Sequence, residues 1–102
     1  MQLIKKLSEM IDDELEGAEC YAEKALKYKN EDSTLAKMFY TMANEEMDHF
    51  EKLHFAVVEK IEEWRKQNGE PPAGMMTLYD YLHEKHIKHA SRIKIMLAMY
   101  KE

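Results

Sequence analysis

Hydrophobic residues recur at alternating intervals of three and four along most of the chain, which is the spacing of one face of an α-helix. Two polar breaks interrupt this pattern. The run 30–33 is rich in residues that begin helices, and the run 68–74 contains two Gly and both Pro. The pattern therefore predicts an all-α fold in a single domain, 1–102, with helices at about 3–29, 33–67 and 78–101 and a linker at 68–76.

Each predicted helix has one stripe of mainly apolar residues, and the third helix is expected to start with Thr77 and Asp80 in a capping-box-like arrangement. At ~1.5 Å per residue the second helix would be ~50 Å long, against the ~26 Å diameter of a compact globule of this size. Its far end, near Val57, Ile61 and Trp64, needs the third helix or another subunit to cover it, so self-association is expected. The stripes are Ile4, Leu7, Ile11, Glu14, Ala18, Tyr21, Ala25 and Tyr28; then Leu35, Phe39, Met42, Glu46, His49, Leu53, Val57, Ile61 and Trp64; then Tyr79, Leu82, His86, Ala90, Ile93, Leu97 and Tyr100.

Composition narrows the class of protein. A formal net charge of −5 argues against general nucleic-acid binding, and no apolar run approaches the ~20 residues that cross a membrane. A hydrophobic content of 45% with 34% charged residues is typical of a globular helical protein. The single cysteine, Cys20, excludes internal disulfides, an all-cysteine zinc site and a rubredoxin-type iron centre, and it fits a reducing cytoplasm.

Three metal-binding side chains lie on the apolar stripes, namely Glu14, Glu46 and His49. If the first two helices fold back near residue 31, residue i faces about residue 62 minus i, which places Glu14 between Glu46 and His49. An ionised carboxylate in a core is costly unless it is paired or binds metal. A Glu-x-x-His pair with a Glu from the next helix is half of the ligand set of a two-metal carboxylate site, so a second chain would supply the rest.

The type and number of donors favour particular metals. Oxygen-dominated ligation with one imidazole per metal suits iron, with manganese as an alternative, better than zinc or copper(I). A lone Glu-x-x-His pair has little weight, because Glu51 and His54 form a second one that is expected on the solvated surface. The alternative interpretation of the three residues is a polar interface layer that binds no metal.

Other polar residues are open to two interpretations. The repeat of His83, His86 and His89 is either a second metal site or iron-entry patch, or an interface in which His86 is satisfied by a neighbour. Cys20 and the nine Met residues are interpreted as structural.

The segments 14–21 and 42–49 resemble the first-helix and second-helix motifs of rubrerythrins and other members of the ferritin-like superfamily. With only one such half, the chain is most similar to the encapsulated ferritins, over residues 7–58. The resemblance implies a four-helix bundle made by two chains and a di-iron centre that oxidises Fe(II) with oxygen or peroxide. Residue by residue, it implies that Glu14, Glu46 and His49 hold iron, that Tyr21 lies near the centre, and that Asp13 and Glu16 guide iron in.

The chain also departs from that family. Cys20 occupies the place of a Trp, the third helix is longer and richer in His, and residues 99–102 show no recognisable shell-targeting tail. We therefore expect a cytoplasmic homodimer or larger homo-oligomer, with the lumen of an encapsulin shell as an alternative location. Two alternative functions stay open, a metal-free helical adaptor and a peroxide reductase fed with electrons by a partner.

Overall fold

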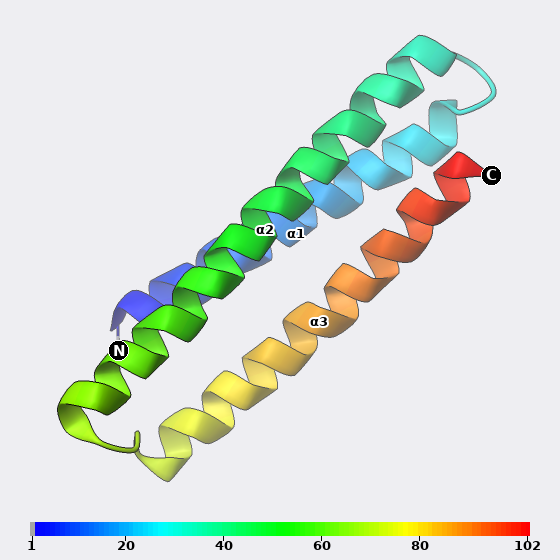
Figure 1. The fold of residues 1–102 in the computed structure, drawn as a ribbon. Helices are drawn as coiled ribbons and strands as arrows, with labels where there is room; N and C mark the ends of the chain where they lie inside the picture. The colour runs from blue at the N-terminus through cyan, green and yellow to red at the C-terminus, as the bar shows by residue number, and fades with distance from the viewer. Residues whose placement is uncertain (1) are drawn as a thin grey trace.

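The computed structural model describes residues 2–102, and these form three helices and no strands: α1 (Gln2–Tyr28), α2 (Ser33–Asn68) and α3 (Ala73–Lys101). Helices α1 and α2 make an antiparallel hairpin, and α3 returns alongside it (Figure 1). The chain measures 55 × 18 × 17 Å, so its length is that of α2. The predicted all-α fold is confirmed, and α3 packs on its own hairpin, mainly against α1. None of the described helices is long and apolar enough to cross a membrane.

The helix ends follow local chemistry. Asp32 caps α2 by accepting a hydrogen bond from the Leu35 amide at 3.1 Å, and Gly69 ends α2 in a left-handed conformation with φ of 79°. The predicted start of α3 is wrong, because the helix begins at Ala73 directly after Pro72. Pro72 is the N-cap residue, and the helix does not extend further back because the residue before a proline disfavours helical backbone. The Thr77 hydroxyl donates to the Ala73 carbonyl inside the helix instead of capping it.

The core lies between all three helices. In α3 the buried residues all belong to the predicted stripe. In α1 and α2 five of the twelve buried residues belong to it, and the other seven each follow a predicted residue by one position. Ala22, Ala36 and Ala43 are among the seven positions that follow a predicted residue, beside larger side chains such as Leu15 and Phe50, and the predicted residues that they replace in the core stay half-buried or exposed. The buried residues are Ser8, Ile11, Leu15, Ala18, Ala22 and Ala25; Ala36, Ala43, Met47, Phe50, Val57 and Ile61; and His86, Ala90, Ile93 and Leu97.

Helix α3 is attached to α1 by two histidine–carboxylate pairs. His86 Nε2 lies 2.8 Å from Asp12 Oδ1, and His89 Nε2 lies 3.2 Å from Glu19 Oε2. His86 is 4% exposed, as expected of an interface histidine. The histidine repeat is thus part of the contact between helices, and the described residues do not assemble a second metal-binding group from it.

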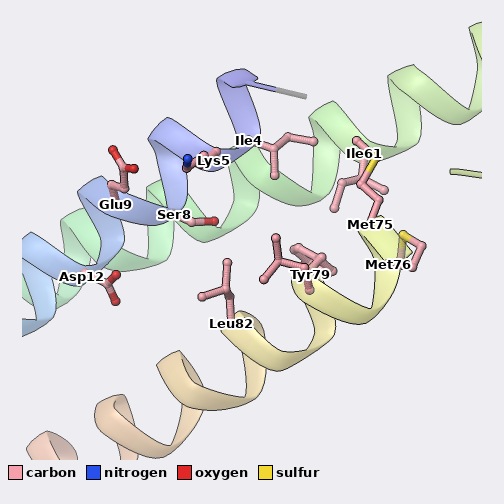
Figure 2. A pocket seen from close by; sticks show the side chains of 11 residues that line it. Ile4, Lys5, Ser8, Glu9, Asp12, Ile61, Met75, Met76, Tyr79 and Leu82 are labelled. Carbon is pink, nitrogen blue, oxygen red and sulfur yellow. The ribbon is translucent and has the colours of Figure 1, made fainter. Parts of the chain in front are cut away.

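The first turns of α3 stand off from α1 and leave a cavity of about 490 Å³. Figure 2 shows Tyr79 and Leu82 of α3 directed toward Ile4, Ser8 and the rest of the α1 wall across this space. The cavity is thus mainly apolar, and only the α1 wall brings charged side chains to it. Helix α3 is therefore held more tightly in its second half than at its start.

One broad face of the hairpin is left uncovered by α3. Because successive residues of a helix turn by about 100°, Glu14 projects about 200° away from Asp12, which contacts α3. Side chains on this face are half-buried, apart from the exposed His49. We call it the hairpin face, and it consists of Leu7, Glu14, Tyr21 and Tyr28 of α1 with Leu35, Phe39, Met42, Glu46, His49 and Leu53 of α2.

Candidate metal centre

The hairpin brings Glu14, Glu46 and His49 together at the middle of the hairpin face. One ligand atom of each lies within 4.8 Å of the other two, and within residues 2–102 no other group of three such side chains does so. His49 Nδ1 is 3.3 Å from Glu14 Oε2 and 3.8 Å from Glu46 Oε1. The predicted register between α1 and α2 is confirmed, since Glu14 lies beside His49 and Gly17 lies beside Glu46.

Gly17 makes room for the Glu46 carboxylate. A Cβ at position 17 would lie 3.0 Å from Glu46 Oε2, so this oxygen rests directly against the bare backbone of α1. A glycine inside a helix costs about 0.5–1 kcal/mol relative to alanine, and Gly17 shows no positive φ that would require it. Sequence reasoning missed this residue, although it is the only glycine before residue 69 and follows Glu14 by one helical turn.

The carboxylates of Glu14 and Glu46 repel each other when both are ionised. The pKa of Glu46 is raised above its usual value, first by a hydrogen bond shared with the Glu14 carboxyl group and then by burial and by the charge of Glu14, while His49 acts in the opposite direction. A cation between the two groups would remove their repulsion. The site is also reachable, because the side chains of Glu14, Glu46 and His49 are 26%, 27% and 52% exposed.

The donor set fits a hard or borderline divalent cation. Two carboxylates and one imidazole supply oxygen-rich ligation, which iron(II) and manganese(II) accept and copper(I) does not. Three convergent donors leave coordination positions open for water, for a substrate or for ligands from another chain. The space at Gly17, into which the Glu46 carboxylate fits, is consistent with a cluster shaped for a function rather than for stability.

The remaining predicted site residues lie outside this cluster. The Tyr21 ring stacks on Phe39 with centroids 6.2 Å apart, and within the described residues no hydrogen bond joins its hydroxyl to Glu14, Glu46 or His49. Asp13 and Glu16 are exposed and project about 100° and 200° away from Glu14 around α1. The structure therefore brings together the three predicted ligands but neither Tyr21 nor the two proposed entry residues.

The second Glu-x-x-His pair is divided between surface and interior. Glu51 is exposed, as expected, but the prediction of a solvated His54 is wrong. The His54 ring stacks on His83 of α3 at 4.9 Å, and burial together with the charges of His83 and His86 lowers its pKa. Cys20 is an exposed free thiol.

No family model matches the chain, and no curated protein or solved structure matches it either. The ferritin-like resemblance therefore rests on the motif residues of α1 and α2, and the geometry of Glu14, Glu46 and His49 is an independent observation beside it.

Proposed function

We propose that two copies of this chain form a ferritin-like carboxylate protein that takes up Fe(II) and oxidises it with oxygen or peroxide. The observation that carries this proposal is the convergence of Glu14, Glu46 and His49, with ligand atoms within 4.8 Å, at the centre of the uncovered hairpin face. Iron is the substrate in this proposal, and manganese is the alternative metal.

The need for a second copy follows from the hairpin face. Half-buried apolar side chains flank the cluster on both sides, with Leu7 and Leu53 toward one end and Phe39 toward the other. A twofold axis passing near the cluster would bury these side chains and bring two Glu14 and two Glu46–His49 pairs together. The four helices would then form a bundle with the complete ligand set of a two-metal site.

The side chains of this chain have distinct tasks. Glu14 and Glu46 supply the negative charge that attracts and holds Fe(II), and His49 supplies one nitrogen donor. Gly17 keeps the Glu46 carboxylate close to Glu14. Two ferrous ions held by the completed ligand set would each give up one electron, and together these would reduce oxygen to peroxide or peroxide to water. The exposed edge of His49 leaves a path by which ions and oxidant reach the cluster.

The decisive test is the metal-to-chain ratio after anaerobic Fe(II) loading and gel filtration. We expect about one iron per chain, eluting with a dimer or larger species, because each chain supplies half of a two-metal site. Less than about a tenth of an ion per chain for iron, manganese and zinc alike would overturn the proposal. In that case Glu14, Glu46 and His49 would be a polar layer of a metal-free adaptor.

Activity is tested by following Fe(II) oxidation optically with oxygen and with peroxide. Glu46→Ala and His49→Ala are expected to abolish oxidation and to leave the helical circular dichroism signal intact, because neither side chain is part of the buried core. If either variant oxidised Fe(II) at the wild-type rate, the assignment of Glu46 and His49 as iron ligands would be wrong. Faster turnover with peroxide than with oxygen, sustained only by an added reductase, would identify a peroxide reductase instead.

A further inference from the structure

Helix α3 has an unusual outward side. Seven exposed residues follow one another at alternating spacings of three and four on the side of α3 away from the buried His86 and Ile93, except that the first of them, Leu78, also lines the cavity. Four of them are large apolar side chains that are 49–64% exposed, and the three central ones are basic. We call this row the α3 stripe, and it consists of Leu78, Tyr81, Lys85, Lys88, Arg92, Ile95 and Met99.

The α3 stripe is cationic within an acidic protein. Helix α3 contains five Lys or Arg and two Asp or Glu, a formal charge of +3, while the whole chain carries −5. Surface ion pairs of Lys88 with Glu84 and of Arg92 with Glu19 leave the two basic side chains 77% and 67% exposed. The stripe therefore offers apolar ends and a positive centre to a partner.

A second row with the same spacing lies on the outward side of α2. Its central Glu45 and Asp48 are acidic, and Met38 and Phe55, which flank them, are 47% and 63% exposed. We call this row the α2 stripe, and it consists of Met38, Thr41, Glu45, Asp48, Lys52, Phe55 and Glu59. The two stripes together hold six of the ten exposed large hydrophobic residues of the described chain, so these residues are gathered rather than scattered.

Charge decides which surfaces can meet. Two α3 stripes would place six cations against each other, and two α2 stripes would oppose their central acids. An α3 stripe on an α2 stripe instead gives two apolar and two opposite-charge pairs in either relative direction, with Lys52 as the one like-charge contact. With the helices parallel, the apolar pairs are Leu78–Met38 and Ile95–Phe55, and the opposite-charge pairs are Lys85–Glu45 and Lys88–Asp48. With the helices antiparallel, the apolar pairs are Tyr81–Phe55 and Met99–Met38, and the opposite-charge pairs are Lys88–Asp48 and Arg92–Glu45.

We propose that the α3 stripe docks on the α2 stripe of a second copy of this chain. Helices α2 and α3 face each other through His54 and His83, and the two stripes lie on the far sides of these helices, so one molecule cannot join its own stripes. The α3 stripe of one copy can instead lie on the α2 stripe of the next copy in a head-to-tail contact. Asp48 projects about 200° away from Glu46, so this surface is separate from the hairpin face. A head-to-tail contact can continue from copy to copy, so it builds assemblies larger than a dimer, and it needs no metal.

Charge reversal tests the proposal, with the assembly mass measured by light scattering after gel filtration in the presence of a chelator. Lys88→Glu with Arg92→Glu makes the α3 stripe acidic, and Glu45→Lys with Asp48→Lys makes the α2 stripe basic. Each double variant alone is expected to have half of the wild-type mass or less. An equimolar mixture of the two is expected to regain the wild-type mass, because every α3 stripe then finds an α2 stripe of opposite charge.

The control is Lys6→Glu with Lys66→Glu, which changes the net charge as much as the α3 variant but lies outside both stripes. It should keep the wild-type mass. A wild-type chain that stays monomeric at all concentrations, a mixture that fails to regain the larger mass, or a control that loses mass equally would each overturn the proposal. The chelator keeps this result independent of the iron proposal, which is judged by metal content.

Discussion

Carboxylates on two sides of helix α1 contact histidines of the neighbouring helices. The two sides differ in how many carboxylates each histidine contacts. Toward α3, Asp12 pairs with His86 and Glu19 pairs with His89, one acid to each imidazole. On the hairpin face, Glu14 and Glu46 share the single His49. The same residue types therefore give one carboxylate per imidazole on one side of α1 and two carboxylates per imidazole on the other.

The histidines on the two sides of α1 also differ in their exposure to solvent. His86 is 4% exposed and lies 2.8 Å from its acid, so its polar group is satisfied where water is excluded. His49 is 52% exposed as a side chain and lies 3.3 Å or more from either acid. The comparison teaches that residue identity does not separate a structural histidine from a candidate ligand, whereas the number of acids per imidazole and the access to solvent do.

The largest expected effect is on metal affinity. His49→Ala should weaken Mn(II) or anaerobic Fe(II) binding by ~100-fold or more, because removal of a direct ligand should cost at least as much as the loss of its supporting contacts. His86→Ala should leave this affinity within about threefold of wild type, since His86 contacts the far side of α1. Isothermal titration calorimetry of both variants measures the two affinities. Equal losses of metal affinity would show that the two sides of α1 do not differ in metal binding.

The next largest effect is on stability. His86→Ala leaves Asp12 without its buried partner and opens a gap in the α3 interface, which should cost about 1–3 kcal/mol and lower Tm by about 5–15 °C. His49→Ala in metal-free protein should change Tm by less than about 3 °C, because the side chain is exposed. Thermal unfolding monitored by circular dichroism measures both, and a His86 variant as stable as wild type would make that pair dispensable.

The sequence predicted the helices well, because apolar spacing and the two polar breaks are local signals. In α1 and α2 it found five of the twelve buried residues, and the other seven lie one residue beyond a predicted position. Positions such as Tyr21 and Phe39 have the right spacing and large side chains, yet Ala22 and Ala43 are the buried ones. Spacing alone cannot show on which side a third helix will pack, and that choice decides which stripe becomes the core.

The candidate site was predictable to the extent that it depends on register. A hairpin turn near residue 31 was enough to bring Glu14 level with Glu46 and His49. The role of Gly17 was not predictable, because a helical glycine gives no sign of which side chain occupies the space it leaves. The pairing of His86 with Asp12 also needed the position of α3, which lies 74 residues away in sequence.

Gly17→Ala should separate stability from binding within the hairpin face. Alanine favours the helix by about 0.5–1 kcal/mol, so the metal-free protein should gain Tm. The new Cβ would displace the Glu46 carboxylate from its place beside Glu14, so metal affinity should fall by about 3–10-fold. Gly74→Ala is the matched control, because a Cβ there meets nothing within 4 Å and affinity should not change. Unchanged affinity in the Gly17 variant would make the space at this position incidental.

The smallest effect concerns His54, which packs on His83 and Phe50 rather than on a carboxylate and so represents a third arrangement. Burial and the charges of His83 and His86 lower its pKa in the folded chain. As pH falls through about 6.5, the unfolded chain therefore binds a proton at this position before the folded chain does, and stability decreases.

His54→Leu should remove this part of the pH dependence. We expect the free energy of unfolding of the wild type minus that of the variant to be lower at pH 5.5 than at pH 8, because only the wild type loses stability when the unfolded chain binds a proton at residue 54. Chemical unfolding at both pH values measures the two free energies of unfolding. A difference that is the same at both pH values would show that residue 54 titrates alike in the folded and unfolded chains.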